Sequence, residues 1–173
     1  MARNIEIKAN IESISSILPK ALAQATSTPV EIFQDDTFFQ CNNGRLKLRM
    51  FDQARGELIF YRRAHQSGPK ESFYLVTPTS EPNTLRDVLS AGQGVIGRVI
   101  KQRTLIMCGR TRIHLDRVDN LGEFLELEVV LEEDESPENA IAEATLLMAD
   151  LGVSPQQMLE DSYVDMLARK NKR

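Results

Sequence analysis

Charged and apolar residues alternate along five short stretches of the chain. These stretches are residues 4–8, 45–49, 101–103, 110–116 and 126–128. Side chains two positions apart share one face of a β-strand, so each stretch predicts a strand with one charged and one apolar face. A single charged face can simply meet water. Five of them in one compact chain favour a barrel with a charged interior.

The apolar spacing and the turn residues predict eight strands and four helices. The strands are expected at 4–10, 30–40, 44–52, 56–64, 71–77, 96–107, 110–118 and 123–132. Helical spacing predicts helices over 12–25 and 84–91. The pairs Ser136–Pro137 and Ser154–Pro155 predict two more, because serine is a good N-cap and proline fits the first helical position. Most strands are joined by short turns, which predicts an α+β fold: one eight-stranded antiparallel closed barrel with helices packed outside.

Composition limits the classes of protein that fit. The 173 residues are 42% hydrophobic and 27% charged, which is typical of one globular domain, here residues 1–173. No apolar run reaches the roughly 18 residues of a membrane span, and the N-terminus does not resemble a signal peptide. Cys41 and Cys108 lack metal-type spacing and are expected to be reduced thiols in a cytoplasmic protein. The net charge of −4 argues against a nucleic-acid binder with a broad basic surface.

Cations outnumber acids on the predicted inner face of the strands. The cations are Lys8, Arg45, Lys47, Arg49, Arg63, Lys101, Arg103, Arg110 and Arg112, and the acids are Glu6, Asp116, Glu126 and Glu128. This is an excess of five positive charges within a protein of net charge −4. Facing cations are costly unless they are compensated, so the pattern predicts a compact anionic ligand.

The four inner acids offer the oxygen ligands that Mg²⁺ or Mn²⁺ prefers. His65 and His114 are isolated in the sequence, so no zinc site is expected. The chain has neither a G-x-x-x-x-G-K loop nor a convincing Ser/His/Asp set. Phosphoryl transfer needs neither, because metal ions, cations and in-line positioning can perform most of that chemistry.

Four motifs, in order along most of the chain, resemble those of one family. Residues 4–8 look like an E-x-E-x-K motif, and residues 44–49 resemble a basic strand. Residues 101–103 followed by 116–128 resemble K-x-R and then D-x-V-x-x-L-G-x-F-x-E-x-E; residues 162–167 are similar to the closing motif. The chain thus resembles the CYTH superfamily of triphosphate tunnel enzymes. That superfamily includes class IV adenylyl cyclases, thiamine triphosphatase and inorganic triphosphatases.

The resemblance implies roles for individual residues. It implies that Glu6, Asp116, Glu126 and Glu128 face metal, and that Lys8, Lys47, Arg49, Arg63, Lys101, Arg103 and Arg112 contact a triphosphate. Lys8, Lys101 and Arg103 are the expected catalytic cations. Arg45, Arg110 and Lys70 are secondary candidates. Asn4 stands where the family has its first glutamate, and an amide oxygen can coordinate a cation but brings no charge.

The residues leave several functions open. Residues 58–63 and 101–127 look closest to the class IV cyclase branch, which implies conversion of ATP to cyclic AMP and pyrophosphate. The presence of both Glu126 and Glu128 suits equally an inorganic, nucleoside or thiamine triphosphatase. A non-catalytic nucleotide or polyphosphate binder is a further alternative, and the sequence is compatible with a homodimer. A structural alternative places the charged faces outside an apolar barrel.

Overall fold

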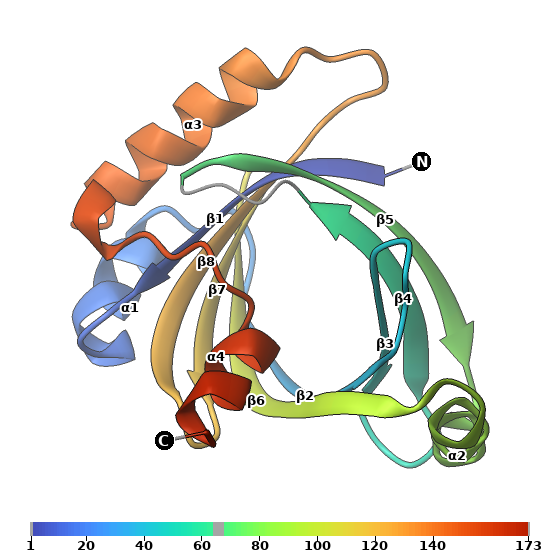
Figure 1. Cartoon of the computed structure of the whole chain (residues 1–173). Coiled ribbons are helices and arrows are strands. Elements are labelled where there is room, and N and C mark those ends of the chain that lie inside the picture. The colour runs from blue at the N-terminus through green and yellow to red at the C-terminus, as the bar shows by residue number, and fades with distance from the viewer. Residues whose placement is uncertain (1, 64–67, 173) are drawn as a thin grey trace.

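Eight antiparallel strands close into a barrel (Figure 1). The computed structural model describes residues 2–63 and 68–172, without the side chains of residues 2 and 63. The strands are β1 (Ala2–Asn10), β2 (Val30–Phe39), β3 (Arg45–Met50), β4 (Gly56–Arg63), β5 (Lys70–Thr79), β6 (Val95–Cys108), β7 (Thr111–Val118) and β8 (Gly122–Val130). Their order around the barrel is β1-β5-β4-β3-β2-β6-β7-β8. The predicted fold class is confirmed.

The helices lie outside this barrel (Figure 1). They are α1 (Ile14–Ala23), α2 (Pro82–Gln93), α3 (Pro137–Asp150) and α4 (Tyr163–Lys170), with one 3₁₀ turn, η1 (Pro155–Gln157). Ser13 caps α1 by accepting a hydrogen bond from the Ser16 amide, which fixes where this helix begins. Pro19 lies inside α1, and the helix continues for four residues beyond it.

The outer face of β1, β7 and β8 is the main hydrophobic core. Ile5, Ile113 and Leu127 are fully buried there, in one cluster with residues of α1 and α3 such as Ile17 and Ala144. Because side chains alternate along a strand, this apolar outer face turns the charged residues inward. The alternative with exterior charges is therefore wrong.

The wall formed by β3, β4 and β5 is covered more thinly. Leu48 and Met50 pack against Leu85 and Leu89 of α2. Other apolar residues of the outer barrel surface stay open to solvent, with Leu75 on β5 51% exposed. One side of the barrel thus belongs to a continuous core and the other does not.

The C-terminal segment completes the barrel seam. β5 pairs with β1 only across Ala2–Glu6, and the next part of that edge is used by the Leu159 amide, which donates to the Lys8 carbonyl at 2.8 Å. The predicted helix from Ser154 is wrong: the Gln157 side chain folds back to the Ser154 amide, and only one 3₁₀ turn forms. The last helix begins instead at Tyr163, after the N-cap Ser162.

Candidate active site in the barrel interior

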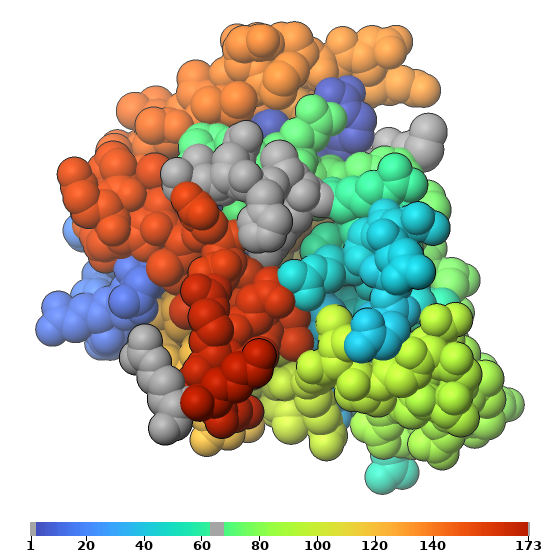
Figure 2. Space-filling model, in the orientation of Figure 1, coloured from blue at the N-terminus to red at the C-terminus, as the bar shows by residue number. Residues whose placement is uncertain are grey.

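The barrel encloses a cavity of about 280 Å³ into which every strand projects side chains. Its lining residues are Asn4, Glu6, Lys8, Gln34, Asp36, Phe38, Lys47, Arg49, Glu57, Ile59, Tyr61, Ser72, Tyr74, Val76, Val99, Lys101, Arg103, Arg112, His114, Glu126, Glu128, Ser162 and Tyr163. Along each strand these positions alternate, as the charge pattern predicts. In the space-filling view, the C-terminal segment (red) lies beside β3 (cyan) at one end of the barrel, where Arg45 and Asp165 form an ion pair of 2.6 Å (Figure 2).

The cavity is less cationic than the sequence pattern predicts. Among the described lining residues, six side chains are cationic and five are acidic. Two of those acids, Asp36 and Glu57, are not in the predicted set. Arg45 and Arg110 face elsewhere, because each is paired with a carboxylate of a helix or of the segment before it. The cavity therefore balances its charges internally and carries only a small positive excess.

Glu126 is the central acid of the wall formed by β7, β8 and β1. Its carboxylate lies 3.3 Å from the Lys8 ammonium, 3.0 Å from the Arg103 guanidinium and 3.2 Å from Nδ1 of His114. Burial opposes ionisation of this group, but Lys8, Arg103 and the His114 hydrogen bond hold its pKa well below the ordinary value. Glu126 is therefore an anion within reach of three other cavity residues.

Asp116 lies on the inner face of β7, but Lys101, Arg103 and Tyr163 cover it, so it is not on the cavity surface. It is fully buried and is absent from the cavity lining. Arg103 donates to both of its oxygens, at 2.6 and 2.7 Å, and Lys101 lies 3.1 Å away. Burial alone would raise the pKa of Asp116, but these two cations lower it. The carboxylate thus fixes the two cations that project past it into the cavity.

A second cluster lies on β2 and β3. Asp36 accepts hydrogen bonds from Nε and Nη2 of Arg49, both at 2.8 Å, and from the Lys47 ammonium at 2.7 Å. Burial, together with the neighbouring charge of Arg49, lowers the pKa of Lys47 to about 7. The Asp36 carboxylate therefore pairs with two cations, and one of them, Lys47, is close to losing its proton at neutral pH.

Aromatic rings lie close to lysine ammonium groups on both sides of the cavity, at the Glu126–Asp116 side and at the Asp36 cluster. The Lys8 and Lys101 nitrogens lie 4.1 and 5.0 Å from the centre of the Tyr163 ring. The Tyr163 hydroxyl donates to Asp116 at 3.0 Å; burial and that carboxylate raise its pKa well above the ordinary value. On the opposite cluster, Lys47 lies 5.5 Å from Phe38 and 5.7 Å from Tyr61. Cation–π attraction helps to place all three ammonium groups.

Most of the predicted site residues meet in the cavity. Those that line it are Glu6, Lys8, Lys47, Arg49, Lys101, Arg103, Arg112, Glu126 and Glu128. Asp116 lies behind them. The secondary candidates lie elsewhere: Arg110 pairs with Glu135 and Glu143, and the Lys70 ammonium donates to the Glu160 carbonyl at 3.0 Å. The Arg63 side chain and His65 lie outside the described residues.

Sequence reasoning missed several polar members of the site. Among them are Gln34, Asp36, Glu57, His114 and Tyr163. His114 is isolated in the sequence, but the pairing of β7 with β8 places it directly opposite Glu126. Gln34 and Asp36 are two residues apart on β2, so their side chains lie on the same face of the strand. The polar residue between them, Asp35, hides this alternation in the sequence, because it points outward to Arg98.

The donor set fits a hard divalent cation. Glu6 and Glu128 are cross-strand partners on β1 and β8, and Glu126 shares their face, so three carboxylates lie on one patch of the wall. Close to them, the buried Asn4 Oδ1 has no hydrogen-bond partner in the described part of the chain. Clustered carboxylates with a spare amide oxygen are suitable ligands for Mg²⁺ or Mn²⁺.

A closed eight-stranded barrel whose interior carries matched cations and carboxylates defines a tunnel-type protein. The CYTH domain model matches residues 2–163, and the chain belongs to this family. A search of curated proteins found no match. Within the described residues, no helix is both long and apolar enough to cross a membrane.

Solved structures share the fold at low sequence identity. The PH1012 protein of Pyrococcus horikoshii OT3 is 20% identical with a TM-score of 0.82, over 94% of this chain and 98% of that one. A proposed adenylate cyclase from Vibrio parahaemolyticus is 20% identical with a TM-score of 0.70, over 95% and 97%. HpAC1 from Hippeastrum, a proposed adenylyl cyclase with a dominant triphosphatase activity, is 15% identical with a TM-score of 0.67, over 100% and 97%.

Proposed function

We propose that this protein is a divalent-metal-dependent enzyme that cleaves a triphosphate inside the barrel. The observation that carries the proposal is the juxtaposition, in one cavity, of six cations and a patch of three carboxylates. Cations match the charge of a phosphate chain, and carboxylates match a metal ion that such a chain binds. A bound divalent cation would neutralise charge on the phosphate oxygens and orient them for attack.

The residues divide this work between them. Glu6, Glu126 and Glu128 would hold the metal, while Lys8, Lys47, Arg49 and Arg112 bind phosphate oxygens. Lys101 and Arg103 are held in place by Asp116 and would stabilise charge as a phosphorus–oxygen bond breaks. We assign Asp116 this positioning role, because both of its oxygens already accept hydrogen bonds from Arg103.

One candidate reaction is that of a class IV adenylyl cyclase. The ribose 3′-hydroxyl of ATP attacks the α-phosphorus, pyrophosphate leaves and cyclic AMP remains. Phe38 and Tyr61 favour a nucleotide, because they offer aromatic surface to a base beside Lys47. A bound phosphate chain raises the pKa of Lys47 above the value of about 7 that it has in the ligand-free protein, so Lys47 acts as a cation and the hydroxyl proton passes to the departing pyrophosphate.

The second candidate is hydrolysis, in which water attacks the γ-phosphorus, the bond from this phosphorus to the bridging oxygen breaks, and the diphosphate part leaves, so that orthophosphate and a diphosphate are the products. The size of the cavity favours it. A volume of about 280 Å³ lies just below the range of about 300–1,000 Å³ for small-molecule pockets. An inorganic triphosphate chain fills such a space more readily than a whole nucleotide does.

One assay separates these reactions. The protein is incubated with ATP, thiamine triphosphate or inorganic triphosphate, each with Mg²⁺ or Mn²⁺, and the products are identified. Cyclic AMP with pyrophosphate identifies the cyclase, and orthophosphate identifies the hydrolase. Tight binding without turnover identifies a non-catalytic binder and refutes the proposal.

Two variants make that assay specific for the cavity. Glu126→Gln removes the charge of the central acid and should abolish turnover. Arg117→Ala removes an exposed cation that pairs with Glu123 at 2.9 Å, outside the cavity, and should leave turnover unchanged. Equal turnover in the wild type and in Glu126→Gln would place the reaction elsewhere.

A further inference from the structure

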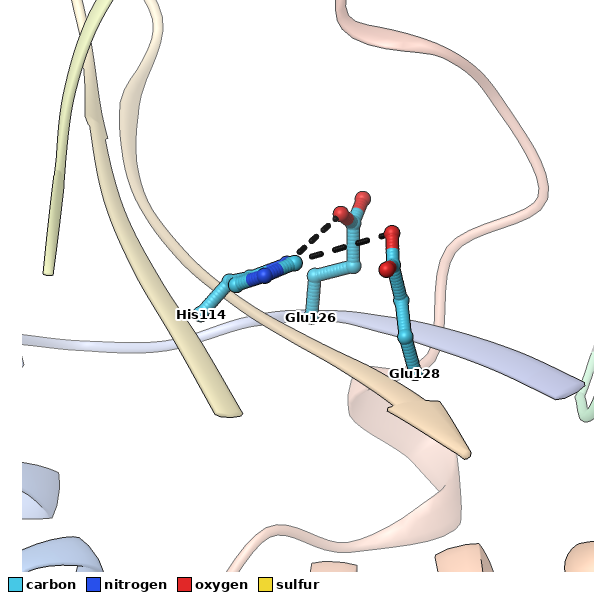
Figure 3. A group of neighbouring side chains, drawn as sticks. All are labelled: His114, Glu126 and Glu128. Carbon is cyan, nitrogen blue, oxygen red and sulfur yellow. Dashed lines mark hydrogen bonds and ion pairs between the residues drawn. The ribbon is translucent and has the colours of Figure 1, made fainter. Parts of the chain in front are cut away.

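His114, Glu126 and Glu128 bring three potential metal-ligand atoms to one point on the cavity wall. Each residue places one such atom within 4.8 Å of those of the other two. Nδ1 of His114 lies 3.2 Å from an oxygen of Glu126 and 3.9 Å from an oxygen of Glu128. Figure 3 shows the imidazole of β7 and the two carboxylates of β8 pointing toward one another.

The strands hold this arrangement before any ligand arrives. His114 pairs directly with Glu126 across β7 and β8. Its neighbours Ile113 and Leu115 are fully buried in the main core, which keeps the imidazole on the cavity side. His114 itself is only 4% exposed. The nitrogen and the two carboxylates are therefore preorganised within a packed wall.

Asn4 gives an independent indication that a cation belongs to this wall. It is 4% exposed, lines the same cavity from β1, and lies next to β8 in the barrel. Its Oδ1 has no hydrogen-bond partner among the described residues. A buried carbonyl oxygen without a partner is unfavourable, and a metal ion would satisfy it.

We propose that His114 is a nitrogen ligand of the metal bound by Glu126 and Glu128, and that it makes this position prefer Mn²⁺ over Mg²⁺. The inference rests on the proposed metal-dependent function and adds the ligand and the metal preference. Mg²⁺ takes oxygen ligands almost exclusively; Mn²⁺ also favours oxygen but, as a first-row transition ion, accepts an imidazole nitrogen among its ligands. Coordination uses the lone pair of Nδ1, so the hydrogen bond between Nδ1 and Glu126 is given up when the metal binds, and the ring proton is carried by Nε2.

The alternative role for His114 is only to orient Glu126 through its hydrogen bond. Such a residue affects every metal alike, because it acts through an oxygen ligand. A true nitrogen ligand instead changes the ratio of the two affinities. It also couples magnetically to bound Mn²⁺. These two readouts separate a ligand from a positioning residue.

The direct test uses the metal alone and the wild-type protein. Mn²⁺ binding is followed by the loss of the free-ion electron paramagnetic resonance signal, and the bound ion is then examined for ¹⁴N modulation of the spin echo. We expect stoichiometric binding with clear ¹⁴N modulation. Absence of Mn²⁺ binding, or bound Mn²⁺ without ¹⁴N modulation, would overturn the inference.

Variants test the preference. His114→Asn puts an amide oxygen near the position of Nδ1, and should weaken Mn²⁺ binding at least tenfold while Mg²⁺ binding, measured by competition, changes less than threefold. His114→Gln serves if the first variant unfolds. Glu128→Gln should weaken both metals, and the exposed Glu133→Gln neither. Equal losses of Mn²⁺ and Mg²⁺ in the histidine variants would reduce His114 to a positioning residue.

The outcome is separable from that of the proposed function. A protein that binds Mn²⁺ with ¹⁴N modulation but cleaves no triphosphate keeps the nitrogen ligand and loses the enzymatic assignment. A protein that cleaves triphosphate with the same metal preference in the wild type and in His114→Asn keeps the enzyme and loses the nitrogen ligand.

Discussion

Two walls of the cavity differ in how their buried cations are neutralised by carboxylates. At the β7–β8–β1 wall, the β6 cations Lys101 and Arg103 pair with the fully buried Asp116, and Arg103 also pairs with Glu126. On the β2–β3 wall, Lys47 and Arg49 share the single carboxylate of Asp36, which itself lines the cavity. The first wall is backed by the main core, whereas the outer face of β3 packs against α2.

This difference suggests a division of labour. Charges that are neutralised behind the surface, in a packed core, keep their geometry and suit a metal site. Charges that are neutralised at the surface by one carboxylate are available for exchange, because an incoming phosphate can replace or share that partner. The β2–β3 wall is therefore the better candidate for the part that responds to the ligand.

The largest expected effect comes from breaking the first wall at Asp116. Asp116→Ala leaves Lys101 and Arg103 partly uncompensated, and removing one partner of a buried ion pair costs about 3–5 kcal/mol. Urea unfolding should show a loss of this size. Asp116→Asn keeps the shape and loses only the charge, so its loss should be smaller. A change below about 1 kcal/mol in the alanine variant would contradict the positioning role.

A smaller effect of opposite sign is expected on the second wall. Asp36→Asn removes the anion that competes with phosphate for Lys47 and Arg49, so affinity for inorganic triphosphate should rise about tenfold, or about 1.4 kcal/mol. Calorimetric titration measures the change. Asp119→Asn alters the net charge equally at an exposed position outside the cavity and should bind like the wild type. Weaker binding in Asp36→Asn would mean that Asp36 orients the cations for the ligand.

The smallest effect concerns the proton of Lys47. Its pKa is about 7 in the folded protein against an ordinary value of 10.5, so between these pH values the unfolded chain binds more protons. The free energy of unfolding must therefore rise with pH in this window, by about 1 kcal/mol between pH 7 and 8. Urea unfolding at both pH values, in the wild type and in Lys47→Met, isolates the contribution. Equal pH dependence in the two proteins would refute it.

The barrel and the inward direction of its charged side chains could be predicted from the alternation of charged and apolar residues alone. The alternation of charged and apolar residues on β1, β3, β6 and β8 correctly predicted that most of the charged side chains line the cavity, because the apolar side chains between them need a core to cover them. Parity could not show where a strand ends. Arg110 has the parity of Arg112 but precedes β7, where it meets the acids of α3 and the segment before it.

The rest depends on contacts between segments distant in sequence. Asp36 was hidden because Asp35 beside it breaks the alternation. Tyr163 reaches the cavity only because the segment before it runs along β1, and no local pattern announces that path. Which carboxylate lines the cavity and which supports from behind, as with Glu126 and Asp116, depends on depth in the wall, which a strand pattern does not encode.

The meeting of the chain's first strand with its closing segment has a consequence for biosynthesis. Lys8 leaves the ribosome about 150 residues before Leu159 and Tyr163, its eventual neighbours. Contacts of such long sequence separation form late. A growing or truncated chain that stops before residue 158 has an open seam and no Tyr163 hydroxyl on Asp116. The proposed chemistry in the cavity therefore requires the segment that ends with Tyr163, and abortive translation products that lack it are expected to be inert.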